Sequence, residues 1–134
     1  MKRIIAATLL VLATSATVQA GEQEDVANAR GEALTWLRIW DAGNVEGSRN
    51  AASAYFRNDV SIDDAKANYE ELRRPLGTLK RRTFKSSSFN TAPDGEYLDV
   101  VFDSDFGNKN AATETVELVR EADGAWKVSA WLIR

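Results

Sequence analysis

Apolar residues recur at three- and four-residue spacing through the first half of the chain, which is the pattern of amphipathic helices. We predict a helix over residues 22–42, because this range carries the longest apolar stripe: Val26, Ala29, Ala33, Trp36, Leu37 and Trp40. A buried tryptophan covers a large apolar area, so both tryptophans are expected in the core. Shorter helices are predicted over residues 48–57 and 62–73, with Ser48 and Ser61 as their N-caps.

Residues 73–82 separate this helical half from a half that alternates as strands do. Pro75 has no amide proton and disfavours the α region for Arg74, so we predict that the preceding helix stops there. Gly77 allows a backbone turn that other residues resist. We interpret the segment as a hinge that folds the helices onto a sheet.

Four runs after the hinge alternate apolar and polar residues with a period of two, as half-buried strands do. The predicted strands cover residues 80–89, 96–106, 112–121 and 126–133. Gly-containing turn signals separate the later runs, which favours an antiparallel meander. The order of elements therefore predicts an α+β fold, with N-terminal helices packed on one face of a curved four-stranded antiparallel sheet.

The same period assigns each strand residue to one face of the sheet. In the last strand it buries Trp126, Val128, Ala130 and Leu132. The outer face would then carry Tyr97, Val101, Trp131 and Ile133. Exposed aromatic and apolar residues mark interfaces when they cluster, so this face is expected to bind a protein partner or a second copy of the chain in a homodimer.

Residues 1–20 have the order of an export signal. Lys2 and Arg3 precede a short apolar run, and the segment ends in Val18-Gln19-Ala20, which fits a small-x-small cleavage site. The run is too short to span a bilayer, where about 20 residues are needed. We expect cleavage near Ala20, a periplasmic or secreted protein without a membrane span, and a single domain over residues 21–134.

Composition excludes several kinds of chemistry. The chain of 134 residues has no histidine and no cysteine, so it has no Ser-His-Asp or Cys-His nucleophile and no ordinary zinc site. Its net charge is −3, and it becomes more acidic once the basic export segment is removed. An acidic chain lacks the basic footprint that nucleic acids require, so a nucleic-acid partner is not expected.

Several short motifs, in their order and spacing, resemble a known family. They are Trp40-Asp41-Ala42-Gly43, Arg74-Pro75-Leu76-Gly77, Arg82, Asp94-Gly95-Glu96-Tyr97, Phe102, Phe106, Glu114-Thr115-Val116 and Asp123-Gly124-Ala125-Trp126-Lys127-Val128. Together they resemble the secreted bacterial family called domain of unknown function 4019. The resemblance implies a cystatin-like or nuclear-transport-factor-2-like fold, and it implies no catalytic residues because that family has no established activity.

Arg82 is the strongest candidate for a binding residue, because it shares parity with Phe84 and is expected to point toward the helices. The rest of its basic cluster is interpreted as solvated: Arg73, Arg74, Lys80, Arg81 and Lys85. Tyr55 and Tyr69 are expected to reach the interior from the helices.

Acidic residues offer two further interpretations, a calcium loop and an isomerase base. Asp103, Asp105 and Glu114 have the outer spacing of a calcium loop, but the glycine falls at the wrong position, so no metal site is predicted. A ketosteroid-isomerase-type enzyme needs an aspartate inside the fold. Asp99 has the parity of the outer face, so it is not expected to act as such a base.

The sequence therefore favours a non-catalytic binding or interaction module without a cofactor. Its partner would be a protein or a small apolar ligand, and the interaction residues would include Arg82, Tyr97, Trp131, Tyr55 and Tyr69. The alternative is a small-molecule pocket binder, or an isomerase-like enzyme, that uses the cleft between helices and sheet.

Overall fold

The computed structural model describes the backbone of residues 2–134 and the side chains of residues 20–134. Its helical half contains α1 (Lys2–Asp41), α2 (Val45–Ala51), α3 (Ala54–Asp59) and α4 (Ile62–Asn68), then the turns η1 (Tyr69–Arg73) and η2 (Arg74–Leu76). Its strands are β1 (Leu79–Ala92), β2 (Gly95–Phe106), β3 (Lys109–Arg120) and β4 (Trp126–Ile133).

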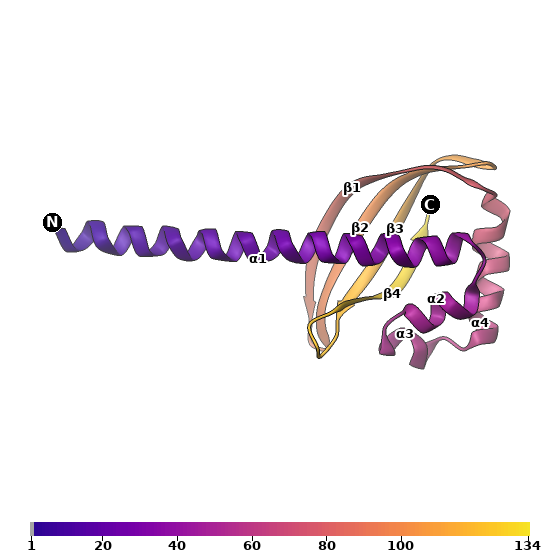
Figure 1. The fold of residues 1–134 in the computed structure, drawn as a ribbon, viewed down its shortest axis with the longest axis horizontal. Coiled ribbons are helices and arrows are strands. Elements are labelled where there is room, and N and C mark those ends of the chain that lie inside the picture. The colour runs from indigo at the N-terminus through magenta and orange to yellow at the C-terminus, as the bar shows by residue number, and fades with distance from the viewer. Residues whose placement is uncertain (1) are drawn as a thin grey trace.

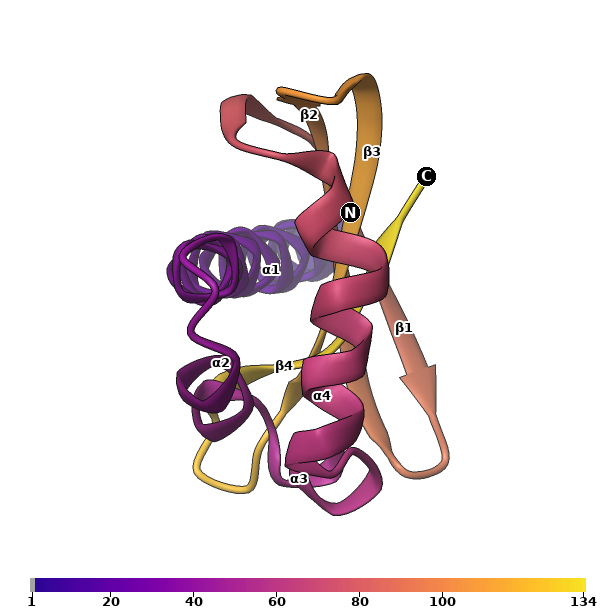
Figure 2. The same cartoon turned by 90° about the vertical axis from the view of Figure 1, so that its right-hand side faces the viewer.

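The four strands form one antiparallel sheet in the order β1-β2-β3-β4. Figure 1 shows α1 crossing the curved sheet, with the shorter helices gathered near the end of α1. Seen along α1, the segment of α4 and η1 stands in front of the sheet (Figure 2). The predicted α+β fold, with helices on one face of a four-stranded meander, is confirmed.

The apolar stripe of α1 makes the centre of the core. Ala29, Ala33, Trp36, Leu37 and Trp40 are all buried, as predicted, and they pack against inward residues of the sheet: Leu98, Val100, Phe102, Val116, Leu118 and Val128. The helix itself is longer than the predicted range, since it begins at Lys2 and its first half projects beyond the sheet (Figure 1). No proline interrupts those residues, so the helical backbone continues through them.

The single helix predicted over residues 48–57 is in fact two helices. Asn44 caps α2 by accepting from the Gly47 amide at 2.9 Å, whereas Ser48 is buried inside the helix. The chain is extended at Ser53, whose amide donates to the Val128 carbonyl at 2.8 Å. This bond to β4 interrupts the helix, and the Ser53 side chain then caps α3.

The helical conformation continues further into the hinge than the position of Pro75 predicted. Ser61 caps α4 as predicted, with its hydroxyl accepting from the Asp64 amide at 3.1 Å. Arg74 stays in the α region, contrary to the prediction, because the chain widens into the π-helical turn η1 and then tightens into the 3₁₀ turn η2. Pro75 occupies the start of η2, where no amide donor is required. Gly77, at φ +78°, then redirects the chain into β1.

A bulge in β4 reverses the predicted faces of the residues that follow it. Glu117 is opposite Ala130 but Leu118 is opposite Val128, so Ser129 is an extra residue in β4. One inserted residue reverses the alternation beyond it. Trp126 and Val128 are buried as predicted, but Leu132 is 60% exposed and Trp131 packs against the core.

Candidate functional site

The end of α1 is held between two arginines. The Asp41 carboxylate accepts from Arg73 Nε at 3.1 Å and from both terminal nitrogens of Arg82, at 2.8 and 3.2 Å. The Arg73 and Arg82 side chains are only 4% and 6% exposed. Asp41 therefore ties the hinge and the first strand to α1 through charged hydrogen bonds.

Arg82 continues this chain of charges into the sheet. Its Nε donates to Glu114 Oε1 at 2.8 Å, and the Glu114 side chain is fully buried. The same carboxylate accepts from the Ser104 hydroxyl at 2.6 Å and from the Trp131 indole at 2.9 Å. A buried network of two positive and two negative charges thus connects Arg73, Asp41, Arg82 and Glu114, and we call it the hinge ion-pair network.

The titration of Arg82 reflects both of its partners. Burial alone would lower the pKa of its guanidinium, but hydrogen bonds to Asp41 and Glu114 outweigh burial and raise that pKa. Arg82 therefore stays charged at any pH at which the protein is folded. An uncompensated guanidinium would be costly at this depth, so the two carboxylates are a structural requirement.

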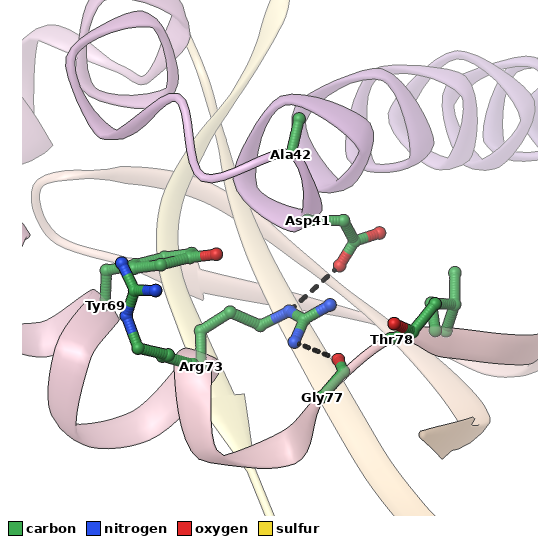
Figure 3. A pocket seen from close by; sticks show the side chains of 8 residues that line it. Asp41, Ala42, Tyr69, Arg73, Gly77 and Thr78 are labelled. Atoms are coloured by element: carbon green, nitrogen blue, oxygen red, sulfur yellow. Dashed lines mark hydrogen bonds and ion pairs between the residues drawn. The ribbon is translucent and has the colours of Figure 1, made fainter. Parts of the chain in front are cut away.

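A cleft of about 520 Å³ opens beside this network. Figure 3 shows the Arg73 guanidinium between Asp41 and Gly77, with Tyr69 alongside. Arg73 donates to the Gly77 carbonyl at 2.7 Å and lies 4.8 Å from the centre of the Phe106 ring. The charged side chains that line the cleft therefore already pair with other groups of the protein. They hold the backbone in place and are less available to a ligand.

A second and smaller pocket, of about 110 Å³, lies between the helices and the sheet. It is lined by Trp36, Trp40, Ser48, Phe56, Ala65, Asn68, Leu72 and Trp131, none of which is charged. Trp36 and Trp40 stack with ring centres 5.4 Å apart, and Trp131 meets Trp40 edge-on at 5.6 Å. We call this cavity the tryptophan pocket.

Trp40 has a feature that the other tryptophans lack. Trp36 donates its indole proton to the Ser48 carbonyl at 2.8 Å, and Trp126 donates to Asp25 at 3.3 Å. Trp131 donates to Glu114. Within residues 20–134, Trp40 Nε1 is the buried side-chain nitrogen that has no hydrogen-bond partner. Buried polar groups are nearly always paired, so this donor requires an explanation.

The predicted site residues divide between the interior and the surface. Arg82 points toward the helices as expected, and Tyr69 packs edge-on against Trp40 with ring centres 5.1 Å apart. Tyr55 does not reach the interior, because α3 starts only at Ala54 and presents Phe56 to the tryptophan pocket instead. Tyr55 is 53% exposed.

The outer face of the sheet differs from the prediction in two residues. Trp131 and Ile133 face the helices because of the bulge in β4, so they do not belong to an outer interaction surface. Tyr97 stays outside and donates to Asp94 at 2.9 Å, and this hydrogen bond raises the pKa of Tyr97 to about 12. The outer face thus loses its largest predicted anchor.

The acidic residues that have the outer spacing of a calcium loop do not point toward a common site. Asp105 accepts from the Ala111 amide at 2.8 Å and from Arg81 at 3.0 Å on the outer side of the sheet. Glu114 faces the core and pairs with Arg82. No group of three potential metal ligands occurs within the described part of the chain.

The sequence did not predict the roles of four residues of the site. Trp40 was predicted as a core residue but not as an unpaired hydrogen-bond donor, and the buried ion pairs of Asp41, Arg73 and Glu114 were not predicted. Arg73 was interpreted as solvated, but η1 turns it under α1 and buries it. Glu114 shares the inward parity of Val116, which was the available signal. The pairing of Asp41 with Arg82 joins residues 41 positions apart, and nothing in the local pattern indicates it.

Comparisons with known proteins agree with this architecture. A family profile described as "Protein of unknown function (DUF4019)" matches residues 32–131. A search of curated protein sequences found no match. Within the described part of the chain, no helix is long and apolar enough to cross a membrane.

Three solved structures share the fold at low sequence identity. A protein from Catenulispora acidiphila is 11% identical, with a TM-score of 0.56 over 85% of this chain and 93% of that chain. A candidate ketosteroid isomerase from Shewanella frigidimarina is 17% identical, with a TM-score of 0.52 over 80% and 94% of the two chains. The protein Aln2 from a Streptomyces species is 14% identical, with a TM-score of 0.50 over 83% and 90%. At these identities the likeness establishes the fold alone.

Proposed function

The chain belongs to the DUF4019 family, and we propose that this member is a non-catalytic protein that binds a small, largely apolar molecule in the tryptophan pocket. The observation that carries the proposal is the pocket itself. Concave, mostly apolar cavities with a few polar groups are the usual form of small-molecule sites. This one lies between helices and sheet and is walled by four aromatic side chains.

The size of the pocket limits the ligand. Its volume of about 110 Å³ is somewhat below the roughly 150 Å³ of an engineered apolar cavity that binds benzene. The ligand is therefore limited to about the size of one ring. Leu72 lines the pocket and is nevertheless 42% exposed, so a slightly longer ligand would extend along it toward solvent.

The inward carboxylates support binding without catalysis. A general base must be within reach of the proton that it removes and must have a lone pair available. Asp41 accepts from two arginines, and both oxygens of Glu114 accept from neighbouring side chains. Neither carboxylate lines the tryptophan pocket. We therefore assign these acids a structural role.

Native mass spectrometry of the protein, purified gently from its own host, tests the proposal. We expect a reproducible small adduct on the wild-type protein. Leu72→Trp adds bulk to the pocket wall and should abolish the adduct, whereas Leu132→Trp adds the same bulk on the outer face and should retain it. An adduct-free wild-type protein, or an adduct that survives Leu72→Trp, would contradict the assignment.

Export is a separate part of the proposed function. The charge pattern of residues 1–20 supports a cleavable signal, and the first half of α1 projects away from the sheet, so its removal would leave the core unchanged (Figure 1). Expression of the full chain in a Gram-negative host followed by cell fractionation tests this. We expect a periplasmic product that begins at Gly21, and a full-length cytosolic product would contradict it.

The outer sheet face is a weaker candidate site. It keeps Tyr97 and Val101, but Asp99 and Glu117 are direct neighbours across β2 and β3. Two copies that met through this face would bring like charges together. A homodimer or protein partner at this face stays a prediction from sequence that the geometry does not strengthen.

A further inference from the structure

We infer that the cleft beside the hinge ion-pair network is a second binding site, and that its ligand is a small organic carboxylate. The cleft has a volume of about 520 Å³ and shares no lining residue with the tryptophan pocket. The inference therefore goes beyond the proposed function and does not depend on it. The observation that carries it is one terminal nitrogen of Arg73, Nη2, for which the protein provides no acceptor.

Arg73 is paired through two of its three guanidinium nitrogens. Nε donates to Asp41 at 3.1 Å and Nη1 donates to the Gly77 carbonyl at 2.7 Å, whereas Nη2 has no acceptor within residues 20–134. Nη2 is not enclosed either, because Trp40 Nε1 is the side-chain nitrogen in that range that is both unpaired and shut off from solvent. The Arg73 side chain is 4% exposed and lines the cleft, so Nη2 reaches solvent through the cleft.

Two hydroxyl groups of the cleft are unpaired as well. Tyr69 and Thr78 line the cleft, and neither hydroxyl has a hydrogen-bond partner among the described side chains. Figure 3 shows the Arg73 guanidinium reaching from the Tyr69 side of the cleft toward Thr78. Both oxygens of Asp41 already accept from arginines. The cleft thus offers an N–H that only donates and two hydroxyls that can donate, so a ligand must supply the acceptor oxygens.

The charge of the lining favours a single negative charge on the ligand. Arg73 and Arg74 line the cleft with two positive charges, and Asp41 adds one negative charge. Glu70 pairs with Arg74 and Glu114 completes the buried network, but neither of these acids lines the cleft. One carboxylate would make the lining neutral, and its hydrogen bond to a guanidinium would be charge-assisted. A phosphate dianion would leave an excess of negative charge beside Asp41.

The apolar part of the lining indicates what the carboxylate is attached to. Ala42 and Leu79 line the cleft together with the Tyr69 ring. A ligand whose head group binds Arg73 would therefore lay a short apolar chain against these side chains, which removes apolar surface from water. The ligand class is thus a small aliphatic carboxylate.

Butyrate and butyramide form a matched pair for the test. The two molecules have the same number of heavy atoms and the same aliphatic chain, and only butyrate is charged. Their affinities are measured at neutral pH by NMR titration, through the backbone amides of residues 77–79. We expect butyrate to bind about 5- to 10-fold more tightly than butyramide, because charge-assisted hydrogen bonds are roughly twice as strong as neutral ones.

Two substitutions place the same charge inside and outside the cleft. Ala42 and Ala67 are both exposed, but Ala42 lines the cleft and Ala67 lies on α4 and lines neither pocket. Ala42→Glu brings a competing carboxylate into the cleft and should weaken butyrate binding by at least about 10-fold, the loss of one hydrogen bond to a charged group. Ala67→Glu should bind butyrate as the wild type does.

Arg73→Lys tests the nitrogen itself, because lysine keeps the positive charge and has no Nη2. We expect it to weaken butyrate binding and to leave the weaker binding of butyramide nearly unchanged. Circular dichroism confirms that each variant is folded. If Arg73→Lys does not fold, the comparison of Ala42→Glu with Ala67→Glu still decides the question.

Three outcomes would overturn the inference. They are equal affinities for butyrate and butyramide, unchanged butyrate binding by Ala42→Glu, and no shift of the amides of residues 77–79 at millimolar butyrate. Shifts confined to the indole protons of the tryptophan pocket would place the anion there and overturn the inference as well. The proposed function is tested separately, by the adduct on the wild-type protein and on Leu72→Trp.

Discussion

Arg82 and Glu114 lie on β1 and β3 and form an ion pair across the strand between them, with Nε and Oε1 2.8 Å apart. Glu114 is fully buried, and the Arg82 side chain is 6% exposed. Because Arg82 also holds Asp41, this pair links the end of α1 to the middle of the sheet. Removing one partner of a buried ion pair leaves a charge without compensation, which is far more costly than losing a surface pair.

Glu114→Gln is therefore expected to lower the free energy of unfolding by about 3 kcal/mol, in the range measured for broken buried pairs. Urea denaturation measures the change. Asp105→Asn is the matched control, since it removes an acid from the pair of Asp105 with Arg81, whose side chain is 76% exposed. The control should cost less than about 1 kcal/mol. Equal losses in both variants would show that the hinge ion-pair network stabilises the protein no more than an exposed ion pair does.

The bulge at Ser129 places two neighbouring residues in opposite surroundings. Trp131 packs on Trp40 and donates to Glu114, so Trp131→Ala should cost about 3–5 kcal/mol. Leu132 is 60% exposed, and Leu132→Ala should change stability by less than about 0.5 kcal/mol. Thermal and urea unfolding of the two variants provide the comparison. A larger loss in Leu132→Ala than in Trp131→Ala would contradict the bulge and would support the regular alternation predicted from the sequence.

Gly77 and Gly31 give opposite expectations for the same substitution. At φ +78° and ψ −161°, Gly77 has a conformation that is nearly exclusive to glycine, and a Cβ there would lie 3.0 Å from Asn108 Nδ2. Gly77→Ala should therefore cost about 1–3 kcal/mol. Gly31 lies inside α1, and a Cβ at that position would meet no atom within 4 Å apart from the backbone of its own helix, so Gly31→Ala should stabilise by about 1 kcal/mol. A Gly77→Ala denaturation midpoint at or above that of the wild type would contradict the hinge geometry.

Asp99 makes stability depend on pH. Burial, and then the neighbouring Glu117, raise the pKa of Asp99 above its ordinary value. The folded protein thus holds this proton more tightly than the unfolded chain, and stability falls as pH rises from the ordinary pKa through the raised one. Asp99→Asn should stabilise the protein at neutral pH, and the gain should vanish in acid where wild-type Asp99 is protonated.

Asp103→Asn is the control for that pH profile, because Asp103 is exposed on the same strand and the same face. Urea midpoints recorded across the acidic range measure both variants. A stabilisation of Asp99→Asn that persists unchanged at the lowest pH would show that its charge is not the cause.

The sequence predicted the layers of this fold because periodicity depends only on neighbouring residues. The α1 stripe and the order of the four strands follow from spacings of three or four residues and of two. The faces of Trp131 and Leu132 were wrong, since one extra residue at Ser129 reverses parity and leaves no signal in composition. The resemblance to the family came from motif order, and the family match confirms it.

The candidate site was only partly predictable. Arg82 was placed correctly by its parity with Phe84, but its partners Asp41 and Glu114 come from elements that are distant in sequence. The missing acceptor of Trp40 is a property of packing, because it depends on which groups surround one nitrogen atom. Such an unpaired donor becomes visible only when all its neighbours are in place.

The central claim is that the pocket beside Trp40 receives a ligand, and an NMR titration of the four tryptophan indole protons with benzaldehyde tests it most directly. We expect the indole protons of Trp36, Trp40 and Trp131 to shift, because all three residues line the pocket. Trp126 does not line that pocket and donates to Asp25, so its signal should stay in place. If no indole signal moves at saturation, or if Trp126 moves as much as Trp40, the claim is wrong.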